Sequence, residues 1–202
     1  TVDGDPILVD RTGGTLVAWA PAALAVTTSA SGAEYTLTAQ KDAAAQDLIY
    51  QPQPVNAANA GAVAVEMKHA YSKLSFLATA GNGYTGAANL TQVQITGGIY
   101  ATGTLNMVDG KVDPVGTATG TLTLAAGEKA LVIPMAGQPT IAVTCTIDGK
   151  EFTANIKADT MPSLLAGVEY EITLTVVGQE AVISSVKEVP WTTTKVDGGT
   201  IF

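Results

Sequence analysis

One segment of the sequence, residues 140–157, can form little other than a β-hairpin. Apolar and polar side chains alternate along it, and the dipeptide Asp148-Gly149 interrupts the alternation near its middle. Successive side chains of an extended strand point to opposite faces, so the alternation predicts two half-buried strands. Asp-Gly favours a two-residue type I′ turn, because both central residues of that turn need a positive φ. The hairpin then places Cys145 opposite Phe152 on one sheet face.

The same alternation recurs along most of the chain. It is found in residues 63–69, 73–79, 90–96, 100–106, 118–124, 129–135, 168–177 and 182–189. Evidence for helices is limited to residues 43–48, which are too few to hold a helix alone, and to a possible single turn at 163–167. Many short strands separated by glycine-rich turns predict an all-β protein built as a β-sandwich.

Residues 51–61 show no periodicity and contain Pro52 and Pro54, so they are predicted to be a linker. The linker divides the chain into an N-terminal β domain, residues 1–60, and a C-terminal β-sandwich domain, residues 61–202. The first part holds only a few predicted strands, which is few for an independent sandwich. It is therefore expected to be a small or incomplete domain, such as the truncated remnant of a larger one. The chain begins at Thr1 rather than at Met, which fits processing or truncation.

Composition excludes several classes of protein. Hydrophobic residues make up 47% of the chain and charged residues 14%, which suits a packed core and not a disordered chain. The net charge of -8 does not suit a nucleic-acid binder or a protein that docks on anionic lipid. No apolar run reaches the roughly 18 residues of a transmembrane helix.

The residues that usually carry catalysis are scarce. The single histidine, His69, lies in a strand pattern and is interpreted as a histidine hydrogen-bonded at a sheet edge, because no nucleophile motif accompanies it. The single cysteine, Cys145, is expected to be a buried and unreactive thiol. One Cys and one His cannot build a zinc site, and no glycine pair has phosphate-loop spacing. We expect neither enzymatic activity nor a metal or cofactor.

Several segments together resemble a known family. They are residues 14–21, 47–50, 63–74 and 165–176, together with the last part of the chain. The first segment ends in Trp19-Ala20-Pro21, the third contains Ser72-Lys73-Leu74, and the last part contains Val189-Pro190-Trp191 and Gly198-Gly199. In this order they are similar to the motifs of Bacteroidales fimbrillins, the subunits of type V pili. The sequence departs from the family in two respects: Trp and Ala replace the usual tyrosines near Pro21, and the first part is short.

The resemblance implies two transthyretin-like β-sandwich domains and no catalytic residues. It also implies export as a lipidated precursor, a place in a fimbrium at the outer-membrane surface, and contacts with other pilin subunits and with host or bacterial surface ligands. Family members polymerise by strand exchange, in which a terminal strand of one subunit fills a groove of the next. Here residues 192–202 are the candidate donor strand.

Two residues are candidate modification sites. Arg11, the only arginine, lies in a predicted exposed turn, where it is either a solvated charge or a maturation site for an arginine-specific protease. Thr160 lies in Asp159-Thr160-Met161, which resembles the O-glycosylation pattern of Bacteroides-type secreted proteins; the alternative is an ordinary turn before Pro162.

Two other functions stay open. A glycan-binding module of a surface nutrient-uptake system would bind sugars on exposed aromatic rings, for which Trp19, Trp191 and six tyrosines are available. An enzyme is the third alternative, and the lone His69 and Cys145 speak against it.

Overall fold

The computed structural model describes residues 12–29, 32–56, 63–137, 140–191 and 195–196. Within these ranges all regular structure is β, which confirms the predicted all-β fold. The strands are β1 (Gly14–Ala20), β2 (Thr27–Ser29), β3 (Gly32–Thr38), β4 (Gln40–Lys41), β5 (Ile49–Val55), β6 (Val65–Glu66), β7 (Lys68–His69), β8 (Ser72–Ala80), β9 (Leu90–Ile99), β10 (Thr102–Asn106), β11 (Val112–Val115), β12 (Gly120–Ala125), β13 (Ala130–Val132), β14 (Met135–Ala136), β15 (Ile141–Ile147), β16 (Lys150–Ile156), β17 (Ser163–Leu164), β18 (Val168–Val177), β19 (Glu180–Pro190) and β20 (Lys195–Val196).

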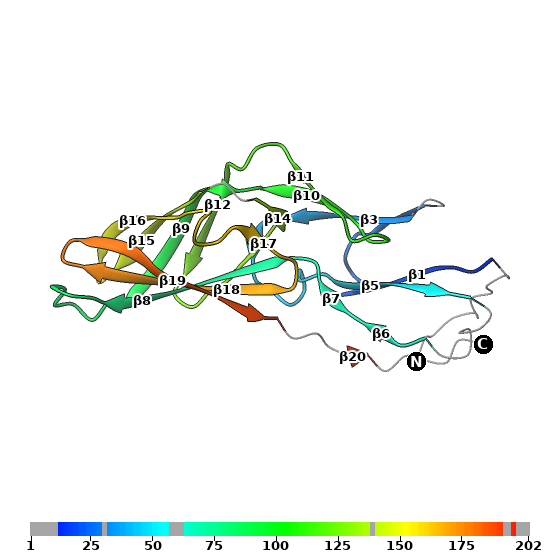
Figure 1. The fold of residues 1–202 in the computed structure, drawn as a ribbon, viewed down its shortest axis with the longest axis horizontal. Coiled ribbons are helices and arrows are strands. Elements are labelled where there is room, and N and C mark those ends of the chain that lie inside the picture. Colours follow the sequence, from blue (N-terminus) through cyan, green and yellow to red (C-terminus); the bar gives the residue numbers. More distant parts are fainter. Residues whose placement is uncertain (1–11, 30–31, 57–62, 138–139, 192–194, 197–202) are drawn as a thin grey trace.

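Four larger sheets enclose two hydrophobic cores (Figure 1). The five-stranded sheet β19-β18-β8-β13-β4 and the four-stranded sheet β12-β9-β15-β16 bury the first core between them. The three-stranded sheet β1-β5-β7 and the four-stranded sheet β11-β10-β3-β2 contribute to the second. β13 serves both cores, because Ala130 and Val132 pack into the first and Leu131 and Ile133, just beyond its end, into the second.

The hairpin predicted at residues 140–157 is confirmed. β15 and β16 pair with Cys145 opposite Phe152, and Asp148 and Gly149 have φ values of 49° and 76°. The Asp148 carboxylate also accepts hydrogen bonds from the Tyr84 hydroxyl, at 2.7 Å, and from the backbone N–H groups of Ala88 and Asn89, both at 2.9 Å. The turn residue therefore fastens the preceding loop to the hairpin.

We expect Asp148→Asn to make stability less dependent on pH. The Tyr84 hydrogen bond, followed by the backbone N–H bonds, lowers the pKa of Asp148 in the folded chain. A lowered folded pKa gives stability that is present above the ordinary aspartate pKa and lost as the pH falls through the folded value. Asn tolerates the positive φ of the turn but offers fewer acceptor sites. Thermal midpoints of the two proteins should differ at pH 7, and the difference should shrink as the pH falls below the ordinary aspartate pKa of about 4 and through the folded value; a constant difference would contradict the assignment.

Residues 51–55 correct the linker prediction. They belong to β5, which pairs along its whole length with β1, from Gly14 opposite Val55 to Ala20 opposite Ile49. On its other side β5 pairs with β7 only at Ile49 and Tyr50. Proline cannot donate a ladder hydrogen bond, so Pro52 and Pro54 weaken the strand signal of this stretch, and the pairing with β1 overrides it. The proposed boundary at residue 60 lies outside the described residues, and the division into domains stays a prediction.

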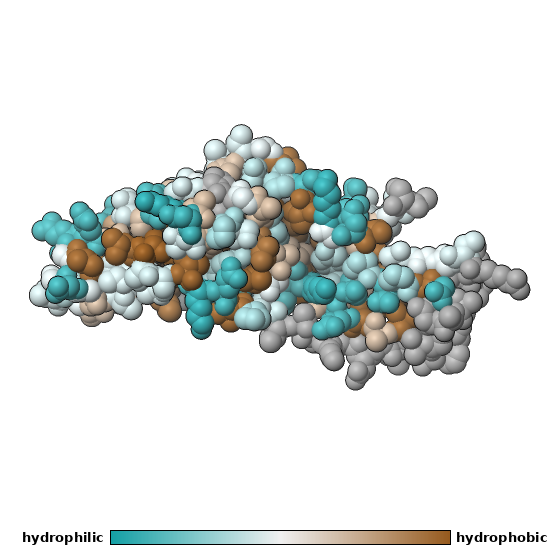
Figure 2. All heavy atoms as spheres, in the orientation of Figure 1, coloured by the Kyte–Doolittle hydropathy of each residue, from teal (hydrophilic) through white to brown (hydrophobic). Residues whose placement is uncertain are grey.

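The edges of the sheets differ in how open they are to another strand. β19, at the end of the five-stranded sheet, carries Lys187 and Glu188 and is distorted where the register shifts opposite Thr173 and Leu174. Figure 2 shows hydrophobic side chains at the surface over this strand, and Val182 is 43% exposed. Charges and a bulge discourage edge-to-edge pairing. β19 is therefore a protected edge despite its length.

Candidate functional site

A groove of about 430 Å³ lies between the two sheets that contribute to the second core. Its lining residues come from β1, from β2 and β3, and from the turn after β10: Thr15, Val17, Trp19, Thr28, Ser29, Gly32, Ala33 and Val108. Thr15, Val17 and Trp19 share one face of β1, because alternate residues of a strand point the same way. The lining is a mixture of apolar groups and hydroxyls, and none of these side chains is ionisable.

Two strand edges border this groove. Among the described residues, β1 ends the three-stranded sheet and β2 ends the four-stranded sheet. Neither strand contains a charged residue or a proline. An edge of this kind presents backbone N–H and C=O groups that another strand can pair with. Chemically, the groove is suited to bind an extended uncharged peptide.

A second site surrounds Trp191, where the chain leaves β19. The Trp191 ring stacks on His69, with 3.6 Å between ring centroids and 12° between planes. The Lys73 ammonium lies 3.6 Å from the Trp191 ring centroid, which is the geometry of a cation–π interaction. The backbone N–H of Trp191 donates to the Gly167 carbonyl at 3.1 Å. We call Trp191, His69 and Lys73 the Trp191 clamp.

Two carboxylates support the clamp. Asp42 Oδ2 lies 2.7 Å from Lys73 Nζ, and both side chains are largely buried. Asp47 Oδ2 lies 2.9 Å from His69 Nδ1. This second contact does not have the alignment of a hydrogen bond, so His69 Nδ1 is buried without a hydrogen-bond partner in the described structure. The other carboxylate oxygen, Asp47 Oδ1, is likewise buried without one. The contact between Asp47 and His69 is therefore a close electrostatic one, and the imidazole is held chiefly by stacking.

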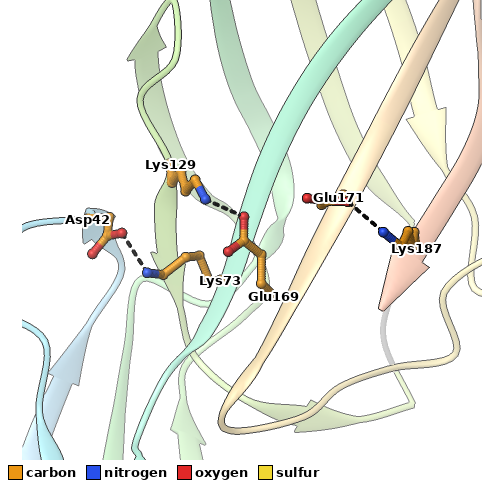
Figure 3. A network of polar contacts seen from close by, with 6 residues as sticks. All are labelled: Asp42, Lys73, Lys129, Glu169, Glu171 and Lys187. Atoms are coloured by element: carbon orange, nitrogen blue, oxygen red, sulfur yellow. Dashed lines mark hydrogen bonds and ion pairs between the residues drawn. The ribbon is translucent and has the colours of Figure 1, made fainter. Parts of the chain in front are cut away.

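Lys73 also belongs to a row of charges that crosses the five-stranded sheet (Figure 3). Lys129 Nζ contacts Glu169 Oε1 at 2.6 Å, and Lys187 Nζ contacts Glu171 Oε2 at 3.5 Å. Burial acts to raise the pKa of Glu169, but hydrogen bonds from Lys129 and Ser75 and nearby lysine charges outweigh it and lower the pKa. In the order of the strands, Lys187 comes first, then Glu169 and Glu171, then Lys73 and Lys129, and last Asp42, so each lysine of the row is paired with a carboxylate.

The residues singled out in the sequence are scattered. His69 lies in β7, the last strand of its sheet among the described residues, which is the edge position expected for it. The hydrogen bond expected for its ring is not formed at Nδ1. Cys145 is fully buried, and burial raises its thiol pKa to about 11. Thr160 is exposed in a turn, where its hydroxyl lies 3.2 Å from Asp159 Oδ1; its glycosylation stays a prediction. Arg11 lies outside the described residues.

The candidate donor strand is described at Lys195 and Val196 alone, which form β20 and pair with Glu66 and Val65 of β6. Trp191 and His69 are each notable in the sequence, but no sequence pattern connects them with Lys73 and Asp42. Their separation along the chain gives no sign of contact. The described ranges contain no group of three His, Cys, Asp or Glu residues able to hold a metal. A helix long and apolar enough to cross a membrane is likewise not found among them.

Comparison with known proteins identifies the family. A model of the family described as "Fimbrillin-like" matches residues 7–191. A "putative cell adhesion protein" from Bacteroides uniformis has a similar solved structure, with a TM-score of 0.69, 24% identity, and coverage of 89% of this chain and 73% of that one. Another "putative cell adhesion protein", from Bacteroides ovatus, has a TM-score of 0.65 and 19% identity, with coverage of 88% of this chain and 68% of that one. These two likenesses concern the fold, and no curated protein matches the sequence. Since the family model spans most of the sequence, the chain belongs to the fimbrillin-like family.

Proposed function

We propose that this chain is a structural or adhesive subunit of a bacterial surface pilus, that it is not an enzyme, and that it assembles by β-strand exchange. Membership of the fimbrillin-like family supports a pilus or adhesion role at the cell surface. The single observation that carries the mechanism is the uncharged groove bordered by the edges of β1 and β2. Its partners are other pilin subunits, of the same or another kind, and export as a lipidated precursor belongs to the same proposal.

The choice of this groove over other edges follows from chemistry. β19 is protected by charges and a register shift, and β5 contains Pro52 and Pro54, which lack the N–H group that an added strand would need. β1 and β2 have none of these protective features. An incoming strand would gain backbone hydrogen bonds from either edge and would place alternate side chains among Val17, Trp19 and Ala33.

The donor in this proposal is the C-terminal segment, residues 192–202, of another subunit. It contains two charged residues, Lys195 and Asp197, and ends in Thr200-Ile201-Phe202. The apolar end suits the apolar part of the groove. Its described part is held in its own chain by two residue pairs of β20 and β6, and so short a pairing is easily exchanged.

The test uses purified chain treated with an arginine-specific protease to remove residues up to Arg11. Strand-exchanged polymers should run as a heat-sensitive ladder on a denaturing gel, because a paired strand in a buried groove resists detergent until the fold melts. Val17→Lys places a charge in the groove and should abolish the ladder. Val115→Lys makes the same change at a residue that is 54% exposed and away from the groove, and should leave it intact.

Two outcomes would contradict the mechanism. One is a strictly monomeric protein after removal of the N-terminal residues, with no change when the last ten residues are deleted. The other is a full ladder from folded Val17→Lys protein, which would exclude this groove as the acceptor.

The groove also favours one alternative. Trp19 and the hydroxyls of Thr15 and Thr28 line it together, and an aromatic face with nearby hydroxyls is a combination that binds sugars. A neutral glycan-binding site is therefore the second candidate function. Specific binding on a glycan array, lost in Trp19→Ala and kept in Trp191→Ala, would support it, and a blank array would remove it.

A further inference from the structure

Three buried side-chain atoms of the described residues have no hydrogen-bond partner: His69 Nδ1, Asp47 Oδ1 and Gln51 Oε1. Buried polar atoms are normally paired, because an unpaired one has lost its hydrogen bonds to water without replacement, so each exception calls for an explanation. All three atoms belong to β5, to β7 or to the segment just before β5. We infer that these side chains are ligands of one divalent transition-metal ion of the copper or nickel type.

The three side chains converge on one face of the sheet β1-β5-β7. His69 lies opposite Ile49 across the β7–β5 pair, and opposite residues share a face. Gln51 follows Ile49 by two residues in β5 and so lies on the same face. It is a diagonal neighbour of His69, at the separation of about 7–8 Å that long side chains can bridge. Asp47 reaches His69 from the segment before β5.

The geometry of His69 and Asp47 is that expected of two ligands of one ion. Nδ1 and Oδ2 lie 2.9 Å apart without the alignment of a hydrogen bond. Two ligands at right angles on one ion, with bonds of about 2.1 Å, are about 3 Å apart. The oxygen then lies to the side of the nitrogen lone pair, which points at the ion instead. Nitrogen and oxygen ligands at right angles are the arrangement that Cu²⁺ and Ni²⁺ favour.

Neighbouring groups hold the ligands in place. The Trp191 ring stacks on His69 and so fixes the orientation of the imidazole. The Gln51 Nε2 group donates to the Pro52 carbonyl at 2.9 Å, which leaves the amide oxygen as the end able to bind an ion. The side chains of His69 and Asp47 are 10% and 14% exposed. An ion can therefore reach the site from solvent and complete its coordination with water.

The charges around the site permit a cation. The Lys73 ammonium lies near the Trp191 ring, but Asp42 pairs with it at 2.7 Å, so the charge of Asp47 stays available to an ion. A count of histidines and cysteines does not reveal such a site, because two of its three ligands are oxygens. In the described structure β5 and β7 pair at two positions. An ion bound between them would therefore strengthen a short strand pairing and stabilise the folded chain.

Calorimetric titration of Ni²⁺ into tag-free, full-length chain, freed of metal with EDTA and then of EDTA, tests the site. One ion should bind per chain, and binding should weaken at least about tenfold in Asp47→Asn and in His69→Phe. The second variant keeps an aromatic ring against Trp191 but removes the nitrogen. Asp113→Asn is the matched control, because it removes a carboxylate that is 66% exposed and pairs with Lys111; it should bind Ni²⁺ like the wild type.

Two further measurements locate the ion and its effect. Cu²⁺ quenches tryptophan fluorescence at short range, and Trp19 and Trp191 are the only tryptophans of the chain. Quenching should be kept in Trp19→Phe and lost in Trp191→Phe. Ni²⁺ should raise the thermal midpoint of the wild-type chain and leave that of His69→Phe unchanged, which compares each protein with itself and so does not depend on how stable the variant is.

Three results would overturn the site: no Ni²⁺ binding to the wild-type chain, equal binding by wild-type and folded His69→Phe chain, or quenching that follows Trp19. Circular dichroism shows whether each variant is folded. If His69→Phe does not fold, Asp47→Asn and the two tryptophan variants decide the question. The site belongs to a single chain, so metal binding by a protein that forms no polymers would support it and still count against strand exchange.

Discussion

Replacing Gly98 by alanine is expected to destabilise the fold by about 3 kcal/mol or more, the largest single effect that we predict for a one-carbon change. Gly98 lies in β9 with a φ of 86°, a backbone conformation that costs an L-residue about 1–2 kcal/mol. A Cβ there would also overlap the Thr140 carbonyl and the Ile141 Cα, which are backbone atoms at the start of the hairpin strand β15. Since neither can rotate away, the two strands would have to separate.

Gly97→Ala is the control for this prediction. Gly97 is the adjacent residue of the same strand, and a Cβ at that position meets nothing within 4 Å. Its effect on the free energy of unfolding, measured in urea, should be within about 0.5 kcal/mol of zero. If Gly97→Ala and Gly98→Ala lowered the free energy of unfolding by similar amounts, the close approach of β9 to Thr140 would not be the reason that position 98 requires glycine.

Leu37→Ala should speed the chemical modification of Cys145 by about 100-fold, although the two residues belong to different cores. Leu37 is fully buried in the second core, so its truncation should cost about 3 kcal/mol. Cys145 is fully buried in the first core, and its raised pKa keeps the folded chain unreactive. A disulfide reagent therefore labels it mainly through unfolding. If both cores unfold together, the lost stability converts directly into labelling rate.

Leu77→Ala is the matched control, since Leu77 is 57% exposed on β8 and should lose little stability. Wild-type labelling rates in Leu37→Ala protein would contradict the prediction. They would show that the residues around the second core unfold by themselves. The experiment thus tests whether the two cores form one cooperative unit.

The parts of the fold that the sequence predicted well are local. The hairpin at 140–157 has the expected turn and register, and the strand expected at 168–177 has those bounds in β18. In both, alternation and turn chemistry act within a few residues of one another, so a single window contains all the determinants.

The parts that were missed depend on distant partners. β8 and β18 pair in parallel, with Phe76 opposite Ile172, and no local pattern gives the neighbour of a strand. Residues 51–55 were assigned to a linker because of Pro52 and Pro54, whereas β1 supplies the partner that makes them a strand. The clamp is a similar case, because nothing in the sequence near Lys73 or Trp191 indicates the contact that the fold creates between them.

The position of β13 between the two cores has a consequence for the fidelity of folding. Ala130 and Val132 face one core, and Leu131 and Ile133 face the other. A slip of this strand by one residue would reverse its faces. The larger pair would then crowd the first core while the smaller pair left cavities in the second, and both errors are costly. A register slip of this one strand thus destabilises both cores at once. A chain in which both cores are well packed must therefore have β13 in the correct register.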